Sequence, residues 1–155
     1  MKRIFLFLLA VMVSLSAHAA DDLADAKITF ETLQTYQRTD DLRALDLFAT
    51  NCVIRFRTIS AVEDKTVFIQ PAAFRDILKD GIAKKAGSQE KYEDVKFSAD
   101  GFAVKVTATV LHPGDIKPGE FMLSYERDGD GVLKIQELKV TTYIAKPANQ
   151  PAAAK

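Results

Sequence analysis

The apolar and polar positions from Leu23 onward follow a helical spacing. Between residues 23 and 33, apolar side chains recur at steps of three and four, which predicts an amphipathic helix capped by Asp21 or Asp22. A polar break follows at residues 39–40. A short second helix with its own apolar stripe is then predicted to end near Asn51.

The middle of the chain predicts a strand, a short strand and a third helix. Residues 52–59 alternate between the two faces of a half-buried strand, and residues 65–69 are predicted to form a short strand. Pro71 suits the first turn of a helix, because its missing N–H would have no partner there. That helix is predicted to end at Gly87. Its expected buried stripe consists of Phe74, Ile77, Leu78 and Ile82.

From Tyr92 onward the period changes from about 3.6 to 2, which predicts consecutive strands. The Asp100-Gly101 pair is typical of a tight hairpin turn. The expected strands cover residues 92–98, 102–110, 121–125 and a last segment up to Ile144, with a Pro- and Gly-rich loop over 113–119 and a turn over 128–131. The second half of the chain is therefore an antiparallel sheet.

The last predicted strand contains a change of parity. Leu133 and Ile135 point to one side, whereas Leu138 and Val140 would point to the other in a regular strand. A β-bulge near Gln136 and Glu137 would bring both pairs to the same face. Because bulges bend strands, we expect a strongly curved sheet whose hollow side the helices cover.

Residues 1–19 have the layout of a secretory signal peptide. Lys2 and Arg3 form a basic start, residues 4–13 are an apolar run, and Ala17-His18-Ala19 offers a cleavage site with small residues. The apolar run is shorter than the roughly 20 residues needed to cross a bilayer. We therefore expect export across the inner membrane, removal of the leader, and a periplasmic location without a membrane anchor.

The mature chain has the size and composition of one globular domain. Hydrophobic residues make up 48% of the sequence, which excludes a disordered protein. We expect one domain over residues 20–145 and a flexible tail over 146–155. Loss of the leader leaves 19 basic against 21 acidic residues, so the net charge of −2 argues against a nucleic-acid partner. Cys52 is the only cysteine, and its apolar neighbours predict that it is buried.

The segment from Phe30 to Phe56 resembles the opening of the nuclear transport factor 2-like superfamily, which includes ketosteroid isomerase-like and SnoaL-like proteins. It reads F-E-T-L-Q-T-Y-Q-R-T-D-D-L-R-A-L-D-L-F-A-T-N-C-V-I-R-F. The order of helix, short helix, strand, helix and antiparallel strands is also similar. The resemblance implies an α+β fold, with a curved antiparallel sheet wrapped around the N-terminal helices like a cone. It also implies a ligand site in the hollow and a homodimer through the outer sheet face.

The resemblance further implies that an enzyme of this type would hold an Asp, or an Asp and His pair, in the hollow. The strand faces expected to point inward carry no Asp, Glu or His, so no catalytic residue is assigned. His112, beside Pro113, is interpreted as a solvated loop residue. The alternative is a lyase or isomerase that uses Tyr36 or Tyr125 as a hydrogen-bond donor with an acid such as Glu126.

One segment has the spacing of a calcium-binding loop. Glu126, Asp128, Asp130, Gly131 and Glu137 fall at positions 1, 3, 5, 6 and 12 of an EF-hand. The flanking residues alternate as strands rather than helices, and Asp-Gly-Asp-Gly is a strong hairpin turn. We therefore predict a hairpin, and neither a metal nor a cofactor.

The sequence favours a non-catalytic domain that binds a small, largely apolar molecule in the hollow. The alternatives are the lyase or isomerase and a dimeric accessory subunit whose outer face includes Arg55 and Arg57. These two arginines need no ligand as exposed charges of a sheet. The predicted ligand-pocket residues are Tyr36, Phe56, Phe74, Val106, Leu123, Tyr125 and Val140.

Overall fold

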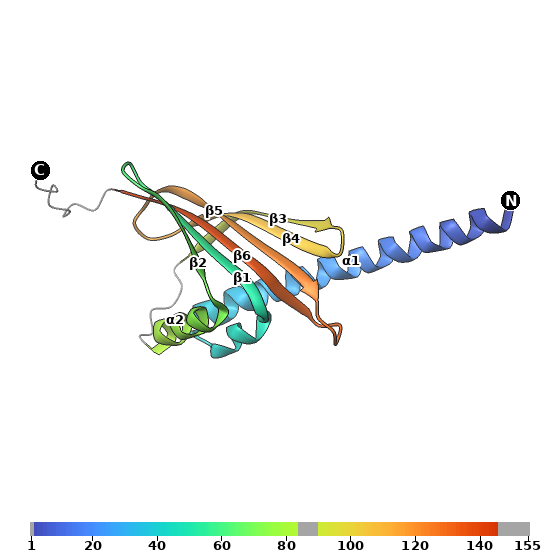
Figure 1. Ribbon diagram of the computed structural model, residues 1–155, viewed down its shortest axis with the longest axis horizontal. Coiled ribbons are helices and arrows are strands. Elements are labelled where there is room, and N and C mark those ends of the chain that lie inside the picture. Colours follow the sequence, from blue (N-terminus) through green and yellow to red (C-terminus); the bar gives the residue numbers. More distant parts are fainter. Residues whose placement is uncertain (1, 84–89, 146–155) are drawn as a thin grey trace, which may run out of the picture.

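The computed structural model describes residues 2–83 and 90–145, which form helices packed on one curved sheet (Figure 1). The elements in chain order are α1 (Lys2–Arg38), the 3₁₀ helix η1 (Leu42–Leu47), β1 (Phe48–Ile59), β2 (Asp64–Ile69), α2 (Pro71–Ala83), β3 (Lys91–Asp100), β4 (Ala103–Leu111), β5 (Asp115–Arg127) and β6 (Leu133–Ile144). The helices lie on one side of the sheet, and α1 continues beyond it toward the N-terminus. This arrangement confirms the predicted α+β fold.

The sheet has the strand order β2-β1-β6-β5-β4-β3. Neighbouring strands are antiparallel except β1 and β6, which pair in parallel. The pair of β1 and β6 thus departs from the expected antiparallel sheet. The direction of β6 follows from the antiparallel meander of β3 to β6, which returns the chain to the free edge of β1.

The predicted bulge in the last strand is confirmed. Ser124 pairs with Glu137, whereas the next residue of β5, Tyr125, pairs with Ile135, so Gln136 is the extra residue. Leu133, Ile135, Leu138 and Val140 are consequently all buried on the same face.

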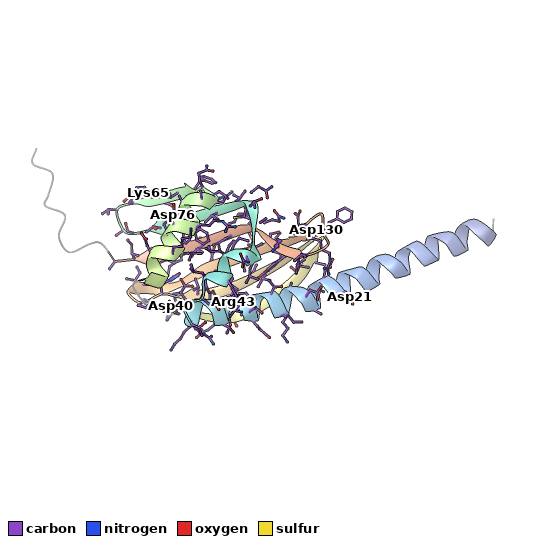
Figure 2. The ribbon with its side chains drawn as sticks, turned by 90° about the horizontal axis from the view of Figure 1, so that it is seen from below. Asp21, Asp40, Arg43, Lys65, Asp76 and Asp130 are labelled. Atoms are coloured by element: carbon purple, nitrogen blue, oxygen red, sulfur yellow. The ribbon has the colours of Figure 1, made fainter. Side chains whose placement is uncertain are left out.

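The N-terminal helix differs from the prediction. It begins at Lys2, so neither Asp21 nor Asp22 is a cap, because the preceding Leu- and Ala-rich run contains no Gly or Pro to end a helix. Asp22 and Asp25 instead accept hydrogen bonds from the Arg127 guanidinium at 2.8 and 2.6 Å. Figure 2 shows Asp21 and Asp130 at the same end of the molecule, where α1 leaves the sheet. Within the described chain, no helix combines the length and the apolar character needed to cross a membrane.

Several element boundaries also differ. The second helix is a 3₁₀ helix capped by Asp41, and it ends at Leu47, so β1 starts four residues earlier than expected. Phe102 lies in the β3–β4 turn with 92% of its surface exposed, although the strand was expected to begin at this residue. The expected loop over 113–119 is short, because β5 already begins at Asp115. Gly87 and the tail over 146–155 fall outside the described residues.

Candidate functional site

An apolar cavity of about 180 Å³ lies between the sheet and the helices. The sheet contributes Phe48, Phe56, Phe121, Leu138 and Val140 to its wall. These residues are brought together by strand register, since Phe121 pairs with Val140, and Val140 pairs with Phe56. One row across β5, β6 and β1 therefore forms the floor of the cavity.

The helices form the opposite wall. Leu33 of α1, Ala44 of η1, and Ile77 and Leu78 of α2 line the cavity together with Phe74. The Phe74 ring packs edge-on against Phe48, with 5.2 Å between the ring centroids. The expected α2 stripe is thus confirmed for Phe74, which is buried. Ile77 borders the cavity but is mostly exposed.

One end of the cavity is polar and is formed by Gln37, Glu90 and Tyr92. The Tyr92 hydroxyl donates a hydrogen bond of 2.5 Å to Glu90 Oε2. His112 Nδ1 lies 3.2 Å from Glu90 Oε1, and its side chain is only 21% exposed. Glu90 is thereby held between a tyrosine and a histidine. We call Gln37, Glu90, Tyr92 and His112 the polar cluster.

The environment of the polar cluster changes the pKa values of its members. Burial, followed by the charge of Glu90 and its hydrogen bond, raises the pKa of Tyr92 far above its usual range, although a hydrogen bond with Gln37 acts in the opposite direction. The hydrogen bond with Glu90 raises the pKa of His112 despite its partial burial, and the charges of Glu90 and Asp115 add to this effect. Tyr92 therefore stays neutral, whereas His112 binds a proton more readily than a free histidine.

The structure separates the seven residues predicted for the ligand pocket into three groups. Phe56, Phe74 and Val140 line the cavity. Val106, Leu123 and Tyr125 are completely buried in the packed core beside it. Tyr36 lies in a different, open surface hollow, where the Arg43 guanidinium stacks over its ring at 4.8 Å.

The cavity wall contains an acid, Glu90, although the strand faces expected to point inward carry no Asp, Glu or His. His112 lies in the segment between β4 and β5, as expected for a loop residue, but its side chain is mostly buried and contacts Glu90 instead of solvent. Two signals in the sequence pointed to the cluster. Glu90 precedes the inward-facing Tyr92 by two positions, and His112 follows the inward-facing Val110 by two. Since Tyr92 pairs with Val110 in the sheet, Glu90 and His112 continue the same row.

Glu126, the acid suggested for a catalytic alternative, is exposed and does not border the cavity. The segment that follows it forms the predicted hairpin between β5 and β6. Asp128 Oδ1 accepts hydrogen bonds from the amides of Asp130 and Val132, and Gly131 has a φ of 77°. Within the described residues, no group of three or more His, Cys, Asp or Glu side chains is arranged to hold a metal ion.

The two arginines of the outer sheet face and the single cysteine lie outside the cavity wall. Arg57 pairs with Asp64 at 2.6 Å, and Arg55 stacks on Phe68 at 4.9 Å with Glu137 Oε1 3.8 Å away. Cys52 is buried as expected, and burial raises the pKa of its thiol. These residues have no evident connection to the cavity chemistry.

Solved structures with the same architecture identify the fold. A cystatin-like protein of the NTF2-like type from Novosphingobium aromaticivorans is 12% identical, with a TM-score of 0.57 and coverage of 86% of this chain and 87% of that one. The chain has the nuclear transport factor 2-like fold. The resemblance noted in the sequence is thereby confirmed at the level of fold.

Other structures with the nuclear transport factor 2-like fold carry names of enzymes. One from Streptomyces avermitilis, provisionally named a dehydratase, is 14% identical, with a TM-score of 0.57 and coverage of 81% and 99% of the two chains. One from Parabacteroides distasonis, provisionally named a ketosteroid isomerase, is 11% identical, with a TM-score of 0.50 and coverage of 73% and 84%. No family model and no curated protein matches the sequence. At these identities, the likeness defines the fold and not the activity.

Proposed function

We propose that this protein binds a small, largely apolar molecule in the cavity between α1, α2 and the sheet. The observation that carries the proposal is the cavity itself, which is apolar along most of its wall and polar at one end. Its volume of about 180 Å³ is close to the roughly 150 Å³ of an apolar cavity that accommodates benzene. The ligand is therefore about the size of one ring with a short substituent.

Saturation-transfer NMR with toluene tests this proposal. We expect saturation transfer to toluene in the wild type and its loss in Leu78→Phe, because the larger ring would fill the cavity from α2. Leu111→Phe is the matched control, since Leu111 is an exposed residue of β4 that does not border the cavity. Equal signals from the wild type and both variants would refute binding at this site.

A second candidate function is acid–base catalysis of the lyase or isomerase type. It is favoured by the position of Glu90, a carboxylate that borders the cavity and is hydrogen-bonded to Tyr92 and His112. A carboxylate so placed could move a proton to or from a bound molecule. Proton–deuterium exchange of cyclohexanone in D₂O, followed by NMR, tests this activity. Exchange that is faster than in buffer, and that is lost in Glu90→Gln but not in Glu93→Gln, would support catalysis.

We also propose that the protein is exported and that cleavage after Ala19 leaves the folded domain in the periplasm. The basic start, apolar run and small residues at the cleavage site support this proposal. The ion pairs from Arg127 to Asp22 and Asp25 would then hold the new N-terminal turn of α1 on the sheet. The intact mass of protein from a periplasmic extract tests the proposal, with an expected start at Ala20. A cytoplasmic protein that retains Met1 would contradict it.

A homodimer through the outer sheet face is a further part of the proposal. Val53 and Phe68 are exposed to 45% and 62% on the neighbouring strands β1 and β2, and Phe68 pairs with Arg55 across these strands. Exposed apolar side chains on one sheet face support the proposal, because a second copy could cover them. Light scattering at tens of micromolar should give twice the monomer mass for the wild type and a monomer for Phe68→Asp. A monomeric wild type would contradict the proposal.

A further inference from the structure

A second hollow, which shares only Phe48 with the apolar cavity, lies where the pairing of β1 with β6 is interrupted. Phe48 pairs with Ile135 and Val53 pairs with Glu137, so residues 49–52 of β1 lie opposite Gln136 alone. A bulge of this kind interrupts the ladder and bends the strand. The hollow measures about 440 Å³, and its wall includes residues 48–51 of β1, Arg75 of α2, and Lys134 and Gln136 of β6. We call it the bulge hollow.

Arg75 is the residue of the bulge hollow that indicates a ligand. Its side chain is partly buried. Burial raises the pKa of the Cys52 thiol and the charge of Arg75 acts in the opposite direction, so the guanidinium lies near β1. Unlike Arg43 and Arg57, which pair with carboxylates, Arg75 forms no hydrogen bond or ion pair with any residue that the structure describes. Its five N–H donors are therefore available to a ligand.

Lys134 adds a second positive charge to the wall of the bulge hollow. Its Nζ donates a hydrogen bond of 2.6 Å to the backbone carbonyl oxygen of Asp46. In the described part of the chain, it forms no ion pair with a carboxylate. A neutral carbonyl orients the ammonium but leaves its charge uncompensated. The hollow thus presents two cations, each from a different element, that have no carboxylate partner.

Two carboxylates also border the bulge hollow and limit the charge that a ligand can carry. Asp128 directs its Oδ1 to backbone amides of its own hairpin turn, and Asp46 is exposed. Together these two acids balance the formal charge of Arg75 and Lys134. A ligand with a single negative charge therefore fits better than a doubly charged phosphate, because it is repelled less by the two carboxylates.

We propose that the bulge hollow binds the carboxylate of a small organic acid, with the guanidinium of Arg75 as its main partner. A planar guanidinium donates two parallel hydrogen bonds to the two oxygens of a carboxylate. Lys134 supplies a second favourable charge, and the side-chain amide of Gln136 supplies a further donor. Phe48 and Ala49 form an apolar part of the wall that suits a short carbon chain. This site is independent of the apolar cavity and of its proposed ligand.

Titration of the full-length protein with butyrate, butyramide and phosphate, followed by two-dimensional NMR, tests the proposal. Butyramide has the shape of butyrate without its charge, and phosphate has charge without a carbon chain. At pH 7 we expect butyrate to bind at least tenfold more tightly than butyramide, and also more tightly than phosphate. The largest chemical-shift changes should occur at the backbone amides of residues 49–51 and at the side-chain amide of Gln136.

Variants of α2 assign the binding to Arg75. Arg75→Gln should remove the advantage of butyrate over butyramide, whereas Arg75→Lys should retain part of it, because the charge remains and the paired donors are lost. Lys79→Gln is the matched control, since Lys79 is an exposed cation of the same helix that does not border the bulge hollow. It should change the affinity for butyrate by less than about twofold. Leu78→Phe, which fills the apolar cavity, should leave butyrate binding unchanged.

The outcomes distinguish this site from the apolar cavity. Equal affinities for butyrate and butyramide, or an advantage of butyrate that persists in a folded Arg75→Gln, would overturn the proposal. Tighter binding of phosphate would overturn the choice of a carboxylate. Loss of butyrate binding in Leu78→Phe would assign the acid to the apolar cavity instead. If none of the three probes shifts the resonances of the bulge hollow, the hollow has no such ligand, and the proposed binding in the apolar cavity is unaffected.

Discussion

Two neighbouring parts of the sheet's inner face differ in how completely they are filled. In the first part, Val106, Leu123, Tyr125 and Ile135 have no accessible surface, and we call this the filled half. In the second part, which we call the cavity half, residues around Phe56 and Phe121 enclose about 180 Å³ of space. Both parts lie on the same sheet and follow the same alternation.

The difference arises from what covers the sheet. The cavity half lies where the end of α1, η1 and α2 meet, and Figure 2 shows Asp40 and Asp76 at this end. Large aromatic rings lie between the sheet and the helices there, as in the edge-on pair of Phe48 in β1 and Phe74 in α2, with centroids 5.2 Å apart. A single alternating strand pattern can therefore supply both a packed core and the wall of a cavity, and the position of the helices determines which one forms.

The largest expected effect is the loss of a side chain from the filled half. Leu123→Ala should lower the free energy of unfolding by about 3–4 kcal/mol, because a fully buried leucine leaves a void that its neighbours cannot fill. Phe56→Ala should cost only about 2 kcal/mol, since Phe56 is half-buried and already borders empty space. Urea unfolding of both variants measures the difference. A larger loss for Phe56→Ala would mean that the two halves are packed alike.

The contrast between Leu123 and Phe56 shows which parts of the packing the sequence pattern predicts and which parts it does not. Alternation identified the inward face of β4, β5 and β6 and even located the bulge at Gln136, because burial of one face is a strong and regular constraint. It could not separate Leu123 from Phe56, since both are apolar residues on that face. Whether such a residue packs against another side chain or borders a cavity depends on the position of α2. The periodicity of the strands does not determine that position.

The polar cluster was missed for a different reason. Glu90 and His112 continue the inward rows of β3 and β4, but each lies beyond the last apolar residue of its strand. Polarity and a following Pro113 suggested a loop, and the same signals wrongly extended that loop to residue 119. The local composition therefore indicated a loop, although the register of Tyr92 with Val110 implies that Glu90 and His112 lie opposite each other.

The next largest effect concerns the close approach of β5 and β6 at the outer end of the cavity half. Gly119→Ala should destabilise the protein by about 2–3 kcal/mol, because an added Cβ would overlap the carbonyl oxygen of Thr141 and force the strands apart. Gly129→Ala is the matched control, since a Cβ there meets nothing within 4 Å. Thermal unfolding of both variants provides the measurement. Equal melting temperatures would show that β5 can move at no cost.

Two tyrosines of the sheet should respond to loss of the hydroxyl group with opposite signs. The Tyr125 hydroxyl in the filled half is buried and has no hydrogen-bond partner among the described residues. Tyr125→Phe should therefore stabilise the protein by about 1 kcal/mol. Tyr92→Phe removes a hydrogen bond to Glu90 and should destabilise it by a similar amount. Urea unfolding at one pH tests the pair, and a change of the same sign in both variants would contradict the distinction.

The smallest expected effect is the pH dependence of stability that His112 contributes. Glu90 raises the pKa of His112 above its ordinary value of 6.5, so the folded protein binds this proton more tightly than the unfolded chain does. The resulting stabilisation is fully present below the unfolded pKa near 6.5 and is lost as the pH rises through the higher folded pKa. The free energy of unfolding of the wild type should therefore decrease between pH 6 and pH 8.5 relative to that of His112→Gln. If both proteins show the same pH profile, the contact between Glu90 and His112 does not persist in solution, and His112 is not a member of the polar cluster.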